Sequence, residues 1–147
     1  MIHRCYIMAE KERNNLMNDA FIENLSPVDF NSTVDRLSKE IEKKSWKISN
    51  VYDLQKTMDK FGKDVLPVKV FSVCHPNHSS RILEKDTERI ISSIMPCRVS
   101  VYEKHDEKTY ISRMNSSIIA SGFGGIIEQV MTDSANEVEE IIEKTLQ

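Results

Sequence analysis

The chain has 147 residues, 39% hydrophobic and 29% charged, and its formal net charge is −3 at pH 7. A chain of this length and composition is expected to fold as one soluble globular domain, without a disulfide or a structural metal to stabilise it. Its lysines alternate with glutamates and form no basic face, which argues against nucleic acid as a partner. No segment reaches the roughly 20 apolar residues that a membrane-spanning helix needs, so no membrane partner is expected.

The three cysteines are an odd number without the spacing of a disulfide framework, which indicates a reducing compartment. The N-terminal segment Met1–Ala9 is too short for the apolar core of a signal peptide. We therefore expect a cytoplasmic protein. Residues 1–19 are predicted to be an N-terminal appendage, with a short polar helix at Glu10–Asn18, and residues 20–147 to form a single domain.

The domain is predicted to begin with a short strand at Ala20–Leu25, which Ser26-Pro27 ends. A helix follows over Ser32–Lys44, because apolar residues recur there at helical spacing. Ser32 and Asp35 have the spacing of a capping box, which places the start of this helix at Ser32. The apolar residues are Val34, Leu37 and Ile41.

The middle of the chain predicts a strand at Trp46–Val51 and a short helix at Tyr52–Phe61, which Gly62 closes. A third strand is expected at Val68–Cys74, and Pro76 ends it.

The next segment predicts a helical turn at Ser79–Lys85 that runs into Thr87–Ser92. Met95–Glu103 has the clearest alternation of apolar and polar residues and is predicted to be a strand. The charged segment Lys104–Lys108 then forms a hairpin connection to a further strand at Thr109–Asn115.

The C-terminal segment Gly125–Leu146 is predicted to be one long helix, because a single apolar stripe continues along its length. An alternative is a break at Asp133, with Ser134 and Glu137 as a second capping box. The glycine-rich segment Gly122–Gly125 fits no phosphate-loop or dinucleotide pattern and is expected to be a flexible connection. The stripe comprises Ile127, Met131, Ala135, Val138, Ile142 and Thr145.

The order of these elements is strand, helix, several strands and a long helix. Strands joined by a hairpin, with helices segregated along the sequence, are typical of an α+β fold. We therefore expect a mostly antiparallel sheet with helices packed on one face.

Two short segments, Cys74-His75-Pro76 and Met95–Glu103, carry a resemblance to a known family. Together with the helix leading into Trp46-Lys47-Ile48 and the strand ending Ser112–Asn115, they make the chain similar to the domain of unknown function 302 family over about residues 20–146. The resemblance implies a TATA-binding-protein-like fold and a homodimer, and it implies no established activity. The chain departs from the family pattern at His75, where asparagine is usual, and at Ser45-Trp46, where a glycine and an aromatic residue are usual.

The residues with the most chemical potential lie where two predicted strands end. If Val68–Cys74 pairs antiparallel with Met95–Glu103, Cys74 and Cys97 meet at one end of the sheet, near His78. Thiolates and imidazoles suit zinc, copper or haem iron, so Cys74, His78 and Cys97 form a candidate metal site.

Three alternatives for these residues stay open. Both cysteines can be small buried hydrophobic residues. Cys74 and Cys97 can also form a reversible disulfide. In a third alternative, Cys74 is a nucleophile with His78 as its base.

A small-ligand site is also predicted around Cys74, His75, Cys97 and Tyr102. Tyr102 can instead pack across the sheet with its hydroxyl at the rim. We therefore expect a non-enzymatic module that binds a small ligand or a metal, or that forms a homodimer. The alternative is a thiol- or metal-dependent enzyme or redox protein that uses Cys74, Cys97 and His78. The sequence identifies no cofactor, and it leaves open whether the protein is an enzyme.

Overall fold

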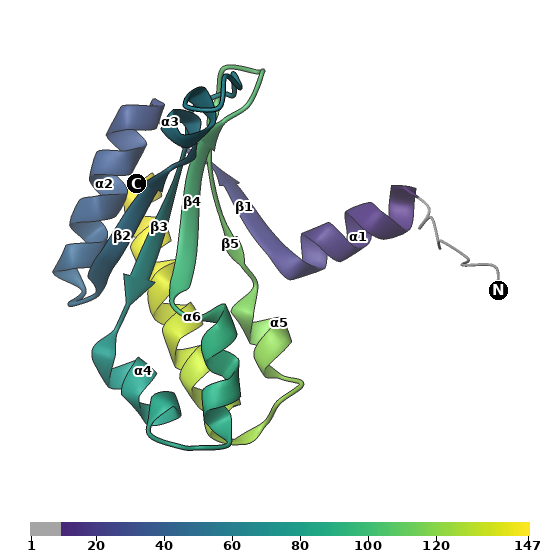
Figure 1. The fold of residues 1–147 in the computed structure, drawn as a ribbon, viewed down its shortest axis with the longest axis vertical. Coiled ribbons are helices and arrows are strands. Elements are labelled where there is room, and N and C mark those ends of the chain that lie inside the picture. The colour runs from purple at the N-terminus through teal and green to yellow at the C-terminus, as the bar shows by residue number, and fades with distance from the viewer. Residues whose placement is uncertain (1–9) are drawn as a thin grey trace.

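The structure, a computed structural model, describes residues 10–147 of the chain. One sheet forms its centre, with helices on one side of the sheet and at both its upper and lower ends (Figure 1). In chain order the elements are α1 (Glu10–Ala20), β1 (Phe21–Leu25), α2 (Phe30–Lys43), β2 (Lys47–Asp53), α3 (Leu54–Asp59), β3 (Val68–Cys74), α4 (Pro76–Leu83), the 3-10 helix η1 (Glu88–Ile94), β4 (Cys97–Glu103), β5 (Thr109–Met114), α5 (Ser116–Ala120) and α6 (Gly125–Leu146).

The sheet has five strands in the order β1-β5-β4-β3-β2, and every neighbouring pair is antiparallel. β4 and β5 are joined by the expected hairpin, with Glu103 opposite Thr109. The predicted α+β class with an antiparallel sheet is therefore confirmed.

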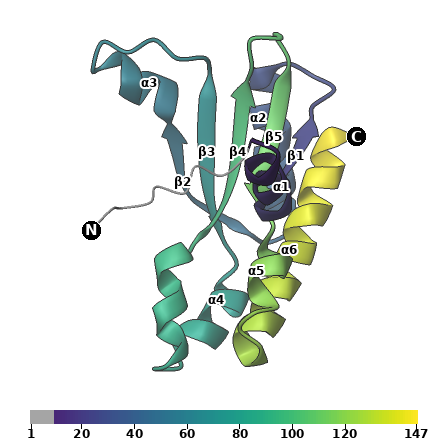
Figure 2. The ribbon, with the colours of Figure 1, turned by 90° about the vertical axis from the view of Figure 1, so that its right-hand side faces the viewer.

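Helices α2 and α6 lie on the same face of the sheet (Figures 1 and 2). Because side chains alternate along a strand, the other face of β4 and β5 carries Ser100, Tyr102, Tyr110 and Ser112, and we call it the open face. The core between the sheet and the two helices consists of Phe30, Leu37, Ile41, Trp46, Phe71, Val73, Val99, Val101, Ile111, Val138, Ile141 and Ile142.

Helix α6 is continuous over 22 residues, as its apolar stripe predicts, and the alternative break at Asp133 does not occur. Its C-terminal half contributes Val138 and Ile142 to the core under the sheet. Its N-terminal half contributes Val130 to a second apolar cluster, with Ile82 of α4 and Ile91 of η1. The stripe therefore packs into two apolar clusters, one under the sheet and one beyond its end.

The start of α2 differs from the prediction. The helix begins at Phe30 with Asp29 as its N-cap, and the Asp29 carboxylate accepts a hydrogen bond of 2.8 Å from the Ser32 amide. The expected capping box at Ser32 and Asp35 is therefore wrong. An aspartate at the N-cap satisfies one of the free amides of the first turn, and Ser32 is the residue that donates this amide.

Other boundaries also shift. β2 continues to Asp53, whose carboxylate accepts from the Lys56 amide and caps α3, so α3 begins two residues later than expected. Pro76 ends the preceding strand as predicted, and it also occupies the first turn of α4, where a proline loses no hydrogen bond. Helix α5 was not expected from the sequence.

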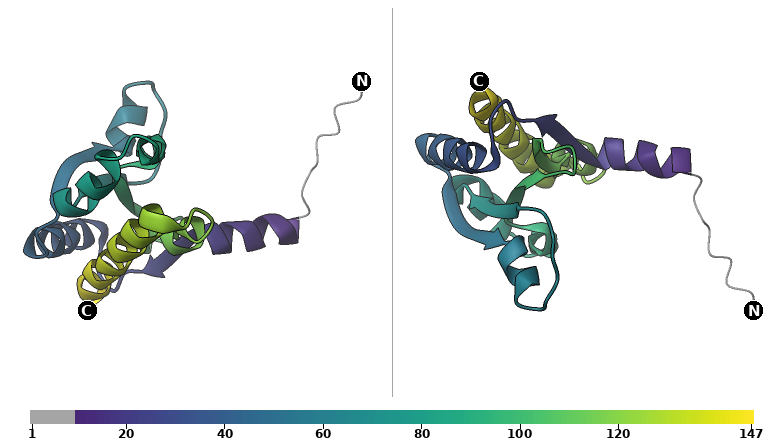
Figure 3. Two further views of the ribbon diagram at one scale, coloured as in Figure 1. Left: turned by 90° about the horizontal axis from the view of Figure 1, so that it is seen from below. Right: turned by 90° about the horizontal axis from the view of Figure 1, so that it is seen from above.

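Helix α1 leads directly into β1 and extends away from the rest of the chain (Figure 3). It covers the predicted Glu10–Asn18 helix, while the remainder of the predicted appendage, residues 1–9, lies outside the described residues. Within residues 10–147, no helix is both long enough and apolar enough to span a bilayer.

Candidate functional site

The pairing of β3 with β4 brings the two described cysteines to the same end of the sheet. Val73 lies opposite Cys97, and Cys74 is the next residue of β3. Both thiols are free and partly buried. The Cys74 Sγ lies 3.1 Å from the Ser79 Oγ, so this thiol has a polar partner on α4.

The turn from β3 into α4 places two histidines side by side. His75 is the N-cap residue of α4, and its side chain makes no capping hydrogen bond. His78 follows three positions later, and residues at this spacing lie on the same side of a helix. As a result, the two imidazole centroids are 4.5 Å apart.

Trp46 and Glu137 complete the cluster from distant parts of the chain. The Glu137 carboxylate accepts from the Trp46 indole at 2.8 Å, and its other oxygen lies 2.8 Å from the His78 Nε2. Trp46 is 2% exposed, so the indole is fixed by the core. Burial raises the pKa of Glu137, but the hydrogen bonds from His78 and Trp46 outweigh it and leave the pKa below its usual range.

His75, His78 and Glu137 together offer one ligand atom each, all within 4.8 Å of one another. Among residues 10–147 this is the group of three such side chains that lies close enough to share a metal ion. The structure does not gather the predicted set of Cys74, His78 and Cys97 in this way. It combines His78 with another histidine and a carboxylate.

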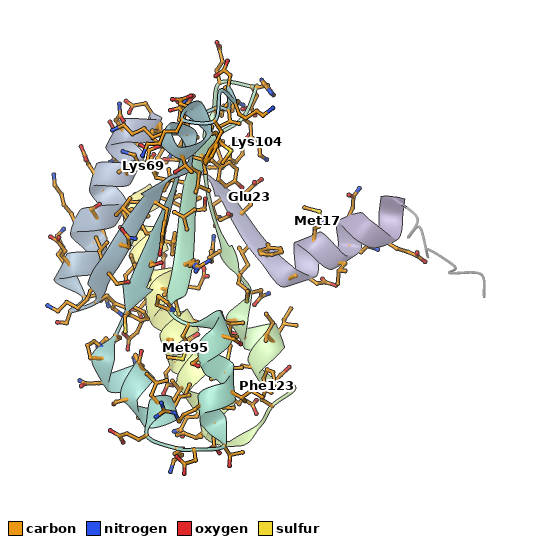
Figure 4. All side chains as sticks on the ribbon, in the orientation of Figure 1. Met17, Glu23, Lys69, Met95, Lys104 and Phe123 are labelled. Atoms are coloured by element: carbon orange, nitrogen blue, oxygen red, sulfur yellow. The ribbon has the colours of Figure 1, made fainter. Side chains whose placement is uncertain are left out.

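A cavity of about 450 Å³ opens beside this cluster. It lies between the lower end of the sheet and the second apolar cluster, where Met95 packs in front of α6 (Figure 4). Aliphatic walls come from Ile82, Ile91 and Val130. Polar groups also line it, among them Cys74, His75, His78, Ser79 and Cys97, as well as Arg113, Ser134 and Glu139.

The Cys97 thiol is poorly suited to reactions that need a thiolate. Burial, and then the neighbouring Cys74 thiol, raise the pKa of Cys97 above its usual value of 9.0. A thiol with a raised pKa is a weak nucleophile and a weak metal ligand at neutral pH.

On another side of the cavity, Arg113 is held by a network of hydrogen bonds. Its Nε donates to Glu139 at 2.8 Å, Nη2 donates to the second oxygen of the same carboxylate, and Nη1 donates to Asn24. Arg113 is 8% exposed. This cation therefore joins β5, β1 and α6 and is already neutralised within the chain.

Tyr102 lies apart from the other predicted ligand residues. It is five positions after Cys97 on β4, which corresponds to about 17 Å along a strand. Its hydroxyl donates to Glu23, whose carboxylate also accepts from Lys104 at 2.7 Å, and Figure 4 shows Glu23 and Lys104 at the upper end of the sheet. Burial, and then the bond to Glu23, raise the pKa of Tyr102 to about 12.

Sequence reasoning missed Glu137 and Trp46 as site residues. Trp46 was predicted as part of a strand, and Glu137 only as a possible cap residue. Glu137 is 59 positions away from His78 in the chain, and no local pattern connects the two. The available sequence signal for a site here was the pair His75 and His78, three positions apart where Pro76 starts a helix; it does not point to Glu137 or Trp46.

The comparisons with known proteins agree with the fold. The model of the family described as "Domain of unknown function DUF302" matches residues 22–147. A similar solved structure is the crystal structure of an uncharacterized conserved protein DUF302 from Bacillus stearothermophilus, with a TM-score of 0.75 and 15% identity over 84% of this chain and 96% of that chain. No curated protein matches the sequence. The chain belongs to the family described as domain of unknown function DUF302.

Proposed function

We propose that the protein is a binding module whose cavity holds a small molecule with an apolar body and one polar end. The observation that carries this proposal is the cavity itself, whose lining combines aliphatic residues such as Ile82, Ile91 and Val130 with the polar groups of Cys74, His75 and His78. Sites for small molecules typically have volumes of about 300–1,000 Å³ and a few convergent polar groups on apolar walls. The cavity of about 450 Å³ fits this pattern.

The alternative function, a thiol-dependent enzyme, has less support. The raised pKa of Cys97 keeps its thiol protonated at neutral pH. Cys74 has Ser79 as its polar partner, and a serine hydroxyl is not a base that would activate a thiol.

A variant that fills the cavity tests the binding function. Ala135 of α6 lines the cavity, so Ala135→Phe is expected to occupy part of its volume. Glu143→Phe adds the same ring on the exposed side of the same helix and serves as the matched control. Saturation-transfer NMR with a set of small aromatic and aliphatic carboxylic acids and phenols should detect binding to the unmodified chain and to Glu143→Phe.

The proposal predicts that this binding is lost in Ala135→Phe. If none of the compounds binds to the unmodified chain, or if the two phenylalanine variants bind them equally, the cavity is not a ligand site. Circular dichroism of both variants checks that each one is folded.

We also propose that the protein forms a homodimer, as the family resemblance implies. The apolar stripe of α6 packs within the chain against both apolar clusters, although Ile127 and Met131 are only partly buried. On the open face, Phe21 and Met114 are paired neighbours that are 52% and 38% exposed, and a second copy would cover them. Sedimentation of the chain should give twice the monomer mass of 17.0 kDa. A monomer alone at micromolar concentration would contradict the proposal.

A further inference from the structure

Three side chains from two helices converge at the edge of the cavity. His75 and His78 are fixed by the start of α4, and Glu137 projects from the middle of α6. Their ligand atoms lie within 4.8 Å of one another. The ring and carboxylate atoms belong to the ligand types that transition metals prefer, namely imidazole nitrogen and carboxylate oxygen.

We propose that His75, His78 and Glu137 bind one divalent transition-metal ion, with zinc as the reference ion. Two histidines and one glutamate are the protein ligands of one class of zinc site. Ligand atoms about 2.1 Å from a tetrahedral zinc ion are about 3.4 Å apart. Atoms that already lie within 4.8 Å reach this spacing by small side-chain rotations.

The surroundings of the three side chains support a metal site independently of their spacing. The Nδ1 of His75 is buried and has no hydrogen-bond partner. A buried ring nitrogen that has lost water without gaining a partner is costly, and a metal-bound imidazole has one nitrogen on the ion. A simple ion pair between His78 and Glu137 leaves this His75 nitrogen unexplained.

Trp46 has the role of an orienting residue for the carboxylate. Its indole donates to one oxygen of Glu137, and the other oxygen lies beside His78. Metal ligands are commonly held by such hydrogen bonds from residues behind them. Because Trp46 is 2% exposed, the carboxylate is oriented by a side chain of the rigid core.

Three protein ligands leave one tetrahedral position for a further donor. His75 and His78 line the cavity, so we expect this position to face it. If the cavity binds a small molecule as proposed above, the polar end of that molecule would be a group that coordinates zinc, such as a carboxylate. This last step depends on the proposed function, whereas the metal site itself does not.

Titration with Zn²⁺ alone tests the metal site. Calorimetry gives the stoichiometry and affinity, and Trp46, the single tryptophan of the chain, gives a fluorescence signal beside the ion. The sequence also has His3 and Cys5 near the N-terminus. The experiment therefore uses the full chain carrying His3→Gln and Cys5→Ser, so that these two ligand types cannot bind the ion.

The expected result is one Zn²⁺ per chain, with a change in tryptophan fluorescence. His75→Gln, His78→Gln and Glu137→Gln should each weaken Zn²⁺ binding by at least about tenfold, since even the loss of a residue behind the ligands costs 10–100-fold. His105 lies exposed in the β4–β5 connection, so His105→Gln is the matched control and should leave binding unchanged. The absence of Zn²⁺ binding, or equal affinities in all four variants, would overturn the proposal.

Two further measurements separate this site from its alternatives. Trp46→Phe removes the indole donor and should weaken binding by roughly tenfold in calorimetry, which a purely structural tryptophan would not do in a variant that remains folded. Co²⁺ can replace zinc and reports its ligands by its absorption spectrum. A thiolate charge-transfer band that disappears in Cys74→Ser or Cys97→Ser would show a cysteine site and refute the histidine–glutamate assignment.

If a variant fails to fold, the Co²⁺ spectrum of the chain with all of its proposed ligand residues intact still tests the assignment.

Ala135→Phe separates the two proposals, because it fills the cavity and leaves the three ligands in place. Zn²⁺ binding that persists in this variant, while binding of the small carboxylic acids is lost, supports both. Zn²⁺ binding without any binding of small molecules would support the metal site and refute the proposed function.

Discussion

Replacing Glu139 by alanine isolates the contribution of a buried cation to the stability of this fold. The substitution removes two of the three hydrogen bonds that Arg113 donates and leaves the one to Asn24. The Arg113 side chain is 7% exposed and the Glu139 side chain 43%. The guanidinium would therefore remain largely buried without its counter-ion.

Breaking a fully buried ion pair from one side costs roughly 3–5 kcal/mol. Because the Glu139 carboxylate is partly exposed, water can replace some of the lost interaction, and we expect Glu139→Ala to lower the free energy of unfolding by about 2–3 kcal/mol. Arg113→Met removes the buried charge itself and leaves a carboxylate that can be hydrated. Its expected cost is about 1 kcal/mol.

The double variant Arg113→Met/Glu139→Ala gives the decisive comparison. It should be more stable than Glu139→Ala alone, because it contains no unpaired buried cation. Urea unfolding followed by circular dichroism and by tryptophan fluorescence measures all three variants. If the two single substitutions are additive, or if Arg113→Met costs more than Glu139→Ala, the pair does not stabilise the fold in the way described.

Three other predictions concern single side chains. Ser45 has a φ of 63°, a conformation that costs an ordinary residue roughly 1–2 kcal/mol. Ser45→Gly removes this cost, although glycine's greater freedom in the unfolded chain offsets about half of the stabilisation. The free energy of unfolding measured in urea should therefore rise by about 1 kcal/mol, and a loss of stability would contradict this. Burial raises the pKa of Glu137, but bonds from His78 and Trp46 keep it below 4.5, so this carboxylate stabilises the fold above about pH 4.5 and loses that effect as the pH falls through its lowered pKa. The difference in Tm between the chain and Glu137→Gln, measured with a chelator present, should shrink as the pH falls below 4.5 and through the lowered pKa, and a constant difference down to acid pH would refute it. With a pKa of about 12, Tyr102 should ionise only at high pH in an ultraviolet titration, and this step should be missing in Tyr102→Phe. An unchanged titration in that variant would show that Tyr102 is not the phenol bonded to Glu23.

Patterns within single elements were sufficient to predict most of the sheet. β4 and β5 are where alternation predicts them, since Val99, Val101 and Ile111 face the core while the residues between them do not. The long α6 was predictable for the same reason, because an apolar stripe at helical spacing needs one continuous helix to bury it. These are local patterns whose physical cause is burial on one side.

The start of α2 shows where local patterns become ambiguous. Both Asp29 and Ser32 are good N-cap residues, and each has a plausible partner three positions later. The structure uses Asp29, which lets Phe30 enter the helix and reach the core. The choice between the two caps depends on burial of Phe30 against other elements, and the sequence around the cap does not contain that information.

The candidate site was only half predictable for a related reason. Cys74, His75 and His78 lie within five consecutive residues, and Cys97 begins the strand that pairs with β3. Strand pairing alone therefore brings them together. Glu137 reaches His78 across 59 residues, and Trp46, the residue just before β2, contacts both. Which distant carboxylate faces a histidine depends on how α6 lies against α4, which periodicity does not specify.

The position of the cavity follows from the different lengths of the sheet and of α6. The 22 residues of α6 span about 33 Å at 1.5 Å per residue, whereas the seven residues of β4 span about 23 Å. The helix is therefore roughly 10 Å longer than the strand, and the N-terminal half of α6 packs against other partners. α4 and η1 provide them in the second apolar cluster.

The apolar core under the sheet and the second apolar cluster both pack on α6, and a gap lies between them. β3 ends at Cys74 and β4 begins at Cys97, while the second cluster contains Ile82 and Val130, so the space between them lies beside this end of the sheet. Glu137 lies in the stretch of α6 that passes from one core to the other. A polar side chain there can turn towards His78 without entering either apolar cluster, which explains why the site lies at this junction.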